Sequence, residues 1–189
     1  MASDATNVLM LESNRLYLRP WQMEDASILY EISKDEEIGP RCGWSPHTSI
    51  EHSCFILKNI LMVEDTYAIV LKENNTVIGN IALMHSKDSN FARNENEGEV
   101  GFWLDKKYWN KGYMQEALHT ILHYAFLTKD FSHIWAGYFE DNNASKHIQE
   151  KTGFTYHHTV ENLYVHALHK KVQLNANVLK KEDYLKKYA

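Results

Sequence analysis

The chain has 189 residues, of which 44% are hydrophobic, so it can bury one substantial core, and no stretch has the composition of a linker. Its formal net charge of -5 argues against a nucleic-acid-binding protein, because contacts with phosphates need a basic surface. An anionic ligand would therefore need a local binding site. We expect a single domain over residues 1–189, with its core within about 13–180.

Cysteine spacing and hydropathy indicate the cellular compartment in which the protein is expected. Cys42 and Cys54 form no CxxC pattern, and two thiols at this spacing suggest neither a disulfide framework nor a zinc cage. No stretch reaches the roughly 20 apolar residues that span a bilayer, and the N-terminal segment lacks basic residues followed by an apolar core. We expect a cytoplasmic protein without membrane contact.

The first part of the chain predicts a strand and two helices. Residues 15–21, RLYLRPW, alternate leucine with polar residues, which is the period of a half-buried strand. Helical spacing of apolar residues follows in 24–38 and in 49–65, where Ser49 is placed to cap the second helix. The Gly and Pro residues of 39–48 predict a loop between these helices.

A hairpin and a further strand are predicted next. Residues 66–85 carry two runs of β-branched and apolar residues around ENN, which favours two strands joined by a tight turn. Residues 88–98 are polar enough for a surface loop. The strand predicted over 99–105 would place one set of alternate side chains on a common face, namely Glu99, Gly101 and Trp103.

The second half begins with a predicted helix that starts near Gly112 or Tyr113. Its apolar stripe consists of Met114, Ala117, Leu118, Ile121, Leu122 and Ala125. A strand over 132–140, a short helix stopped by Gly153, strand-like sequence after Phe154 and a late strand over 170–178 follow. This order of elements predicts a mixed α/β fold of the α+β type.

The start of the helix at Gly112 is a candidate anion site. A helix N-terminus has backbone N–H groups without intrahelical partners and a partial positive charge, and glycine would let a phosphate approach closely. Lys106, Lys107 and Lys111 would add a local positive field to an acidic protein. The alternative interpretation is a turn glycine beside solvated lysines.

Two segments, EVGFWLDKKYWNKGYMQEA and NNASKHIQEKTGF, narrow this choice. Together they resemble the GNAT superfamily of acetyl-coenzyme A dependent N-acetyltransferases, in particular the ribosomal-protein alanine N-acetyltransferases. That group shows E-I-G-Y-W-L, then Y-W-G-K-G-Y-A-T-E-A, then N-x-x-S-x-x-x-x-E-K-x-G-F. The matching residues are Glu99, Gly101, Trp103, Leu104, Tyr108, Trp109, Lys111, Gly112, Tyr113, Glu116, Ala117, Asn142, Ser145, Glu150, Lys151, Gly153 and Phe154.

The resemblance implies a GNAT fold, with a mostly antiparallel twisted sheet of about seven strands flanked by about four helices, and with the fourth and fifth strands splayed apart. Met114 replaces a Gly or Ala of the family and Asn110 a glycine, but the backbone N–H groups survive both changes. The implied cradle for the coenzyme A pyrophosphate is Asn110, Lys111, Gly112, Tyr113 and Met114. The implied backbone partners of the pantetheine arm are Phe102, Trp103 and Leu104.

Acetyl transfer to an amine needs a free lone pair. An α-amino group, with a pKa of about 8, depends less on a base than a lysine, with a pKa of about 10.4. Glu99 is the candidate catalytic base, because Gly101 and Trp103 on its side of the strand could tune a carboxylate for proton transfer, directly or through one water. An exposed strand glutamate is the alternative interpretation of Glu99, and Glu97 and His85 are rival bases.

The departing thiolate, with a pKa of about 8.5 as a free thiol, leaves more easily when a group donates a proton or hydrogen bond to it. Where many superfamily members have a tyrosine, this chain has Gln149, which cannot protonate a thiolate. The resemblance therefore assigns this role to Ser145 and a pantetheine contact to Asn142, both on the helix face of Gln149. Helix capping is the alternative role for Asn142 and Ser145.

The histidines do not predict a metal site. His119 and His123 have i, i+4 spacing, but neither a HExxH glutamate nor a third ligand accompanies them, so we expect no metal. A surface or substrate-side role is expected for the later histidines, namely His157, His158, His166 and His169.

We therefore expect an acyltransferase that moves the acetyl group of acetyl-CoA directly to a primary amine, such as the α-amino group of a protein or peptide, including a ribosomal protein N-terminus. The alternatives are a small-molecule amine (a polyamine, an amino acid or an antibiotic) as acceptor, or a non-catalytic coenzyme A binding module. The first two helices and the loops 39–48 and 86–98 would bound the acceptor, and Asp88, Glu95 and Glu97 would suit a cationic one. No nucleic acid partner is expected, and homodimer formation stays open.

Overall fold

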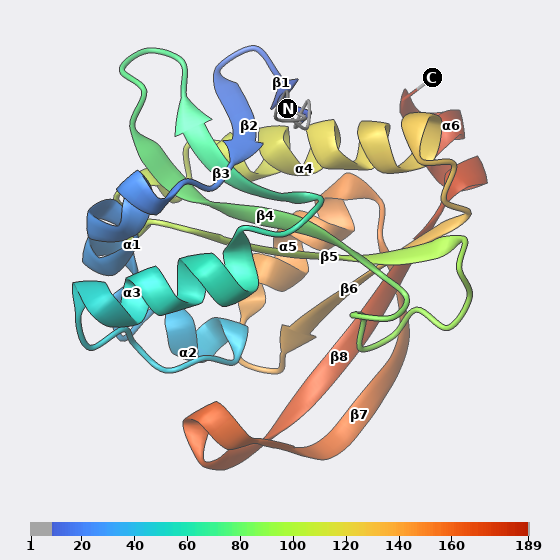
Figure 1. Cartoon of the computed structure of the whole chain (residues 1–189). Helices are drawn as coiled ribbons and strands as arrows, with labels where there is room; N and C mark the ends of the chain where they lie inside the picture. Colours follow the sequence, from blue (N-terminus) through green and yellow to red (C-terminus); the bar gives the residue numbers. More distant parts are fainter. Residues whose placement is uncertain (1–8, 189) are drawn as a thin grey trace, which may run out of the picture.

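One twisted sheet is the frame of the molecule. The computed structural model describes residues 9–188, in which eight strands pair in the order β1-β2-β3-β4-β5-β6-β8-β7 (Figure 1). All neighbouring strands are antiparallel except β5 and β6, which are parallel. The strands are β1 Leu11–Glu12, β2 Leu16–Pro20, β3 Thr66–Leu71, β4 Val77–His85, β5 Glu97–Leu104, β6 His133–Phe139, β7 Thr155–Val165 and β8 Lys170–Lys180.

Six helices lie around this sheet in the described part of the chain. In Figure 1 the first three lie together at the left, and α4 runs along the top, with α6 at its end. Single π-helical turns extend α3 and α4 at their C-terminal ends. The helices are α1 Ala26–Ser33, α2 Gly39–Cys42, α3 Ile50–Ile56, α4 Tyr113–His123, α5 Asn143–Thr152 and α6 Lys181–Tyr188.

The alternation of side chains along the strands produces two cores. Leu16 and Leu18 of β2 belong to a core that α4 covers, whereas Tyr17 between them packs against a second core under α1 and the turn after α3. Each fully buried leucine or isoleucine contributes about 2 kcal/mol through removal of apolar surface from water. The α4 side includes the whole predicted stripe, namely Met114, Ala117, Leu118, Ile121, Leu122 and Ala125.

The parallel pair β5 and β6 holds together only at one end. Its ladder pairs Glu97 with His133, Gly98 with Ile134 and Glu99 with Trp135, and goes no further. The remaining residues of β5 stay paired with β4, and those of β6 stay paired with β8. The sheet therefore opens between β5 and β6 beyond Glu99, as the resemblance implied.

Several predicted boundaries are confirmed. The hairpin of β3 and β4, the start of α4 directly after Gly112 and the end of α5 at Gly153 all stand where the sequence placed them. Ser49 caps α3 by accepting a hydrogen bond from the backbone N–H of His52. Gly153 adopts φ 113°, which an L-residue rarely tolerates and which ends the helix.

The prediction of about seven strands and about four helices was too low. The additional strand is β1, whose two residues are too short to show a period of their own. Within the predicted loop 39–48, α2 forms with proline in its first turn, where the fixed φ of proline favours a helix. The helix α6 was also missed, although acidic residues begin it and lysines end it, which suits the helix dipole.

The described helices also bear on the membrane question. None of them, within residues 9–188, is both long and apolar enough to cross a bilayer.

Candidate active site

A cavity of about 770 Å³ occupies the opening between β5 and β6. Its walls come from α2, β5, the loop before α4, the start of α4, the end of β6 and α5. Lys111 is the one predicted site residue that does not line it. The predicted residues that do are Glu99, Phe102, Trp103, Leu104, Asn110, Gly112, Tyr113, Met114, Asn142 and Ser145.

The loop before α4 has the backbone of an anion cradle. Asn110 and Gly112 adopt φ 59° and 78°, so the chain turns twice through left-handed conformations before the helix begins. A Cβ built on Gly112 would meet only the Nη2 atom of Arg15, at 3.5 Å, and Gly112 itself lines the cavity. The first N–H groups of α4 have no acceptor within the helix, and they suit a phosphate.

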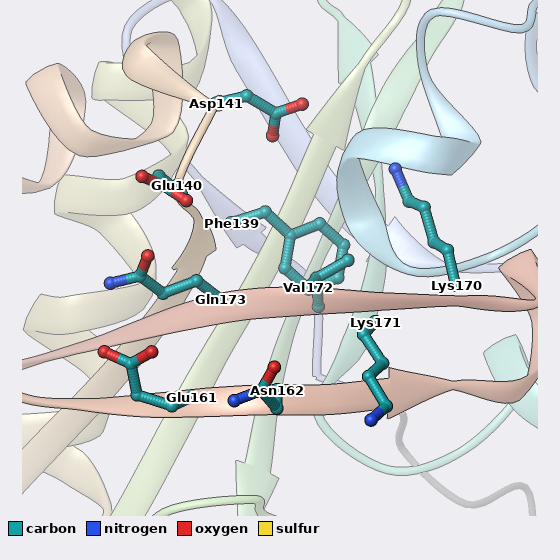
Figure 2. Close-up of a pocket in the computed structure, with 9 residues that line it drawn as sticks. All are labelled: Phe139, Glu140, Asp141, Glu161, Asn162, Lys170, Lys171, Val172 and Gln173. Atoms are coloured by element: carbon teal, nitrogen blue, oxygen red, sulfur yellow. The ribbon is translucent and has the colours of Figure 1, made fainter.

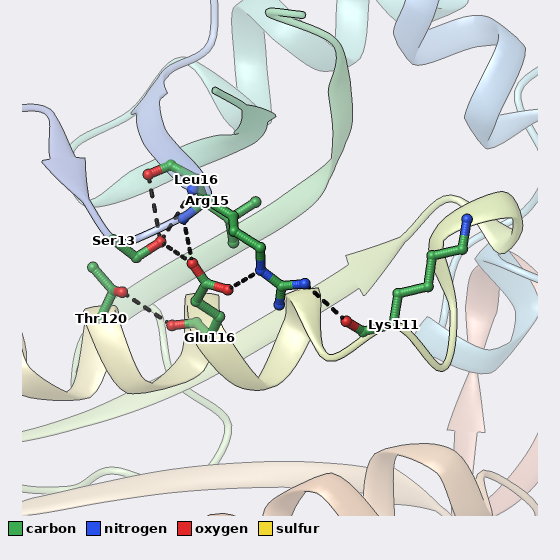
Figure 3. A network of polar contacts seen from close by, with 6 residues as sticks. All are labelled: Ser13, Arg15, Leu16, Lys111, Glu116 and Thr120. Carbon is green, nitrogen blue, oxygen red and sulfur yellow. Dashed lines mark hydrogen bonds and ion pairs between the residues drawn. The ribbon is translucent and has the colours of Figure 1, made fainter. Parts of the chain in front are cut away.

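A polar clamp fixes this loop to the sheet (Figure 3). The Arg15 Nε atom lies 2.7 Å from Glu116 Oε2, and Arg15 Nη1 donates to the Lys111 carbonyl at 3.2 Å. Glu116 Oε1 also accepts from the Ser13 hydroxyl and the Arg15 backbone N–H, each at 2.7 Å. Burial alone would raise the pKa of Glu116, but these hydrogen bonds outweigh it and lower the pKa.

The lysines near the cradle make different interactions. Lys106 forms an ion pair with Glu37, whose carboxylate raises the pKa of the lysine. The Lys111 Nζ atom lies 5.3 Å from the centre of the Tyr108 ring, a cation–π contact. Met114, which replaces the small residue of the family, is buried in the core as the apolar stripe predicted.

The edge of β5 offers backbone groups to the cavity in an alternating pattern. The Trp103 carbonyl points at β4, because a Cβ on Gly79 of that strand would lie 2.4 Å from its oxygen. The backbone groups of Phe102 and Leu104 therefore face the opening. The Leu104 carbonyl already accepts from the Trp109 indole at 2.8 Å. The Phe102 carbonyl lies 4.0 Å from the Cys42 Sγ atom, which donates to it. The N–H groups of Phe102 and Leu104 stay available to an extended ligand.

Glu99 lies at the closed end of the opening, where the β5–β6 ladder stops. The residue is 4% exposed and belongs to the cavity lining. Oε2 accepts from the Ser89 hydroxyl at 2.7 Å and the Asn90 backbone N–H at 2.6 Å, whereas Oε1 has one contact, with Asn90 Nδ2 at 3.4 Å. Oε1 is thus the oxygen with acceptor capacity to spare.

The rival bases are engaged outside the cavity lining. Glu97 accepts hydrogen bonds from Asn94, the Arg93 backbone and Trp135, which outweigh its burial and lower its pKa. The His85 Nε2 atom lies 3.0 Å from Asp65 Oδ2. The two other loop carboxylates suggested for a cationic acceptor also do not line the cavity, namely Asp88 and Glu95.

The helix α5 brings its predicted residues to the cavity. Asn142 caps the helix by accepting from the Ser145 backbone N–H at 3.1 Å, and its Nδ2 donates to the Arg41 carbonyl at 3.2 Å. Ser145 lines the cavity, while Gln149 lies beneath it and is 0% exposed. The capping role of Asn142 is therefore confirmed, and a second role is compatible with it.

Apolar residues that no motif marked complete the cavity wall. They come from the loop before β5, from β6 and from the β7–β8 hairpin, so sequence spacing could not bring them together. We call them the apolar end of the cavity: Phe91, Phe139, Leu163, Val165 and Leu174. Of the predicted histidines, His158 contacts Phe91 at a ring distance of 5.9 Å.

A second, polar hollow of about 410 Å³ lies between the end of β6 and the β7–β8 hairpin (Figure 2). Figure 2 shows its acidic side chains toward one end and its two lysines toward the other. It shares only Phe139 with the main cavity. The charged residues are Glu140, Asp141, Glu161, Lys170 and Lys171.

A split sheet with a helix N-terminus beside the split defines a class of protein that holds an extended, phosphate-bearing ligand between two strands. The family model described as "Acetyltransferase (GNAT) domain" matches residues 15–155 of this sequence. The chain belongs to the GNAT acetyltransferase family. It is therefore an acyltransferase of the N-acetyltransferase type, and its family generally takes the acetyl group from acetyl-CoA.

Relatives agree with this assignment. The uncharacterized N-acetyltransferase p20 of Bacillus licheniformis is 27% identical over 150 residues, which are 76% of this chain and 81% of the relative. The uncharacterized N-acetyltransferase YjdG of Bacillus subtilis is 28% identical over 163 residues, which are 80% of this chain and 92% of the relative.

Solved structures share the fold. A GNAT-family acetyltransferase from Bacillus anthracis aligns with a TM-score of 0.80 and 19% identity, over 92% of this chain and 99% of the other. The ribosomal-protein-S5-alanine acetyltransferase from Vibrio fischeri aligns with a TM-score of 0.71 and 20% identity, over 93% of this chain and 98% of the other.

Proposed function

We propose that the protein acetylates the α-amino group of a peptide or protein, with Glu99 as the base. The observation that carries this proposal is the opening between β5 and β6, which has the α4 cradle on one wall and Glu99 where the strands meet. Acetyl-CoA, the donor of the family, would supply an acetyl group activated as a thioester. The residues on the walls of the cavity supply the binding and the proton transfers.

The cosubstrate would be held mainly by backbone groups. The N–H groups at the start of α4 and of the loop before it, Asn110 to Met114, would bind the pyrophosphate, aided by the positive end of the helix dipole. The free edge of β5 at Phe102 and Leu104, together with Asn142, would pair with the amides of the pantetheine arm, as a peptide pairs with a sheet edge. This arrangement needs no basic surface, which agrees with the acidic net charge.

The chemistry needs a base at one side of the acetyl group and a donor at the other. Glu99 Oε1 would take a proton from the attacking amine, directly or through one water. Ser145 lines the same cavity and would donate a hydrogen bond to the sulfur as it becomes a thiolate. Direct transfer is sufficient, because neither role requires a covalent enzyme intermediate.

The acceptor class follows from charge and polarity. Two carboxylates line the cavity among the described residues, Glu37 and Glu99. Glu37 is paired with Lys106 and lies 3.9 Å from Arg41, so no free carboxylate would receive the second cation of a polyamine. The apolar end of the cavity instead fits the side chain of a small or apolar first residue.

A panel of acceptors tests this choice. Peptides beginning with alanine, serine or methionine, spermidine and free amino acids would each be mixed with acetyl-CoA, and thiol release followed. The alanine peptide comes first because the Vibrio fischeri neighbour, which shares the fold, is named for alanine acetylation. We expect kcat/KM for the best peptide to exceed that for spermidine at least tenfold. The reverse order would make a small-molecule amine the acceptor.

The base is tested by Glu99→Gln. The amide keeps an oxygen for the Ser89 and Asn90 donors but cannot take a proton, so we expect kcat at neutral pH to fall about 100-fold. The KM for acetyl-CoA should change less than twofold, because the cradle is untouched. Glu97→Gln is the matched control and should keep kcat within about threefold. Unchanged turnover in Glu99→Gln would move the base to another residue.

A further inference from the structure

A buried amide pair lies under the cavity floor. Gln149 of α5 is 0% exposed and Asn177 of β8 is 2% exposed. Asn177 Nδ2 donates to Gln149 Oε1 at 3.0 Å. Buried amides are costly unless they are hydrogen-bonded, so such a pair needs a physical reason.

The orientation of the Gln149 amide is fixed by its neighbours. Its Nε2 atom lies 3.2 Å from the Gly137 carbonyl of β6, which can only accept a hydrogen bond. Nε2 must therefore face Gly137, and Oε1 must face Asn177, whose side-chain N–H group donates a hydrogen bond to it. Both contacts therefore agree on one orientation of the Gln149 amide, and the flipped orientation would lose both hydrogen bonds.

The second hydrogen of the Gln149 amide goes to Ser145. Nε2 lies 3.0 Å from Ser145 Oγ, and an amide N–H can only donate, so the Ser145 hydroxyl accepts. Its own hydrogen must point elsewhere. Among residues 9–188 no acceptor for that hydrogen lies within hydrogen-bond distance, and Ser145 lines the cavity.

We infer that Gln149 is a positioning residue: it directs the Ser145 O–H toward the sulfur of the cosubstrate, and Asn177 holds Gln149 in place. This inference rests on the proposed function of Ser145. The Asn177 Oδ1 atom is buried without a partner, a cost that two apolar residues in the same space would avoid. The network is thus explained by what it does for Ser145 and not by stability.

The effect belongs to one step of the reaction. A bond forms between the amine nitrogen and the acetyl carbon, and the carbon–sulfur bond breaks with its electron pair going to sulfur. The amine proton leaves through Glu99 to solvent. Ser145 keeps its proton and donates a hydrogen bond to the thiolate, and Gln149 ensures that the hydroxyl does not turn away.

A double-mutant cycle tests the inference. We expect Ser145→Ala and Gln149→Met each to lower kcat about tenfold, with the KM for acetyl-CoA changed less than twofold. The variant with both changes should be no slower than Ser145→Ala alone, because Gln149 acts through Ser145. Thr152→Val is the matched control and should keep kcat. Thr152 is a buried polar residue of the same helix, and its hydroxyl donates only to the Ile148 carbonyl.

Each outcome of this cycle supports or rejects the positioning role of Gln149. If Gln149→Met folds poorly, Gln149→Met with Asn177→Leu removes the orphaned amide and should show the same fall in kcat. Normal kcat in Gln149 variants beside a slow Ser145→Ala would overturn the inference and leave the proposed role of Ser145 intact. Normal kcat in Ser145→Ala would overturn both. Multiplicative losses in the double variant would mean that Gln149 acts elsewhere, which also rejects the inference.

Discussion

Gly112 shows how one residue serves both the backbone and the ligand. It adopts φ 78° as the N-cap of α4, and it lines the cavity. The sequence marked this position correctly, because the apolar stripe begins at Met114 and glycine is accepted at the N-cap of a helix. The engagement of Glu99 by Ser89 and Asn90 could not be read in the same way, since those residues belong to a loop without a repeating pattern.

The first prediction concerns this glycine. Gly112→Asp should raise the KM for acetyl-CoA about tenfold or more, because a carboxylate beside the cradle repels the pyrophosphate and fills the space that it needs. Gly112→Asn has the same size, tolerates a positive φ and carries no charge, so it should weaken binding clearly less. Equal affinity of Gly112→Asp and the unchanged protein, measured by titration calorimetry, would place the pyrophosphate elsewhere.

At the scale of elements, the clamp of Figure 3 couples the turn between β1 and β2, which holds Arg15, to α4 and to the loop before α4. Arg15 binds the helix through Glu116 and the loop through the Lys111 carbonyl. The helices and strands themselves were predicted well wherever a period of 2 or 3.6 residues ran long enough. The clamp was not predicted, because Arg15 and Glu116 are far apart in sequence and only the fold brings them together.

The second prediction concerns this clamp. Arg15→Met keeps the aliphatic stem but removes the guanidinium, so the Lys111 carbonyl loses its partner and the cradle loosens. We expect the KM for acetyl-CoA to rise about threefold to tenfold, with a loss of stability of about 1 kcal/mol, since the side chain is 43% exposed.

Lys72→Met provides the comparison for Arg15→Met. Lys72 pairs with Glu12 at the same edge of the sheet but does not reach the loop, so this variant should leave the KM unchanged. Equal KM values for the two variants would show that the clamp has no part in binding the cosubstrate.

At the scale of the whole molecule, the buried histidine His47 makes stability depend on pH. His47 is buried against Ser53, and its Nδ1 atom lies 2.8 Å from the serine hydroxyl. Burial, together with the nearby His52, lowers the pKa of His47 to about 4. In the unfolded chain the pKa would be about 6.5, so between these values the unfolded state binds more protons. Stability should therefore fall as the pH falls.

The third prediction follows from this sign. Between pH 7.5 and pH 5, His47 should cost the folded state about 2 kcal/mol, measured by urea unfolding. His47→Asn cannot titrate and should reduce the pH dependence by that amount. His119, whose pKa burial also lowers, would account for part of the dependence that remains. A variant with the same pH dependence as the unchanged protein would show that His47 is not the group responsible.

Asp65 acts in a separate pH window. Burial would raise the pKa of Asp65, but hydrogen bonds from His85, Lys129 and Tyr124 outweigh it, and the pKa is lowered. This carboxylate therefore stabilises the fold above the unfolded pKa of about 3.9, and that stability is lost only at lower pH. Measurements between pH 5 and pH 7.5 consequently do not include the contribution of Asp65 and can report on His47 and His119.

The sequence by itself determined the elements that repeat along the chain and the glycines that bound them. The α4 stripe, the β3–β4 hairpin and the motifs around Gly112 and Asn142 are local patterns, and local patterns express backbone geometry directly. They were enough to indicate the family and the ten lining residues of the predicted site.

Only the tertiary structure decided what lies opposite these residues. The end of the β5–β6 ladder at Glu99, the apolar end of the cavity and the contact of Gln149 with Gly137 and Asn177 join segments that are distant in sequence. Such contacts depend on how the sheet is ordered and how α5 packs on it. No periodicity in the sequence encodes these contacts, because each of these residues packs against a neighbour in space that is distant along the chain.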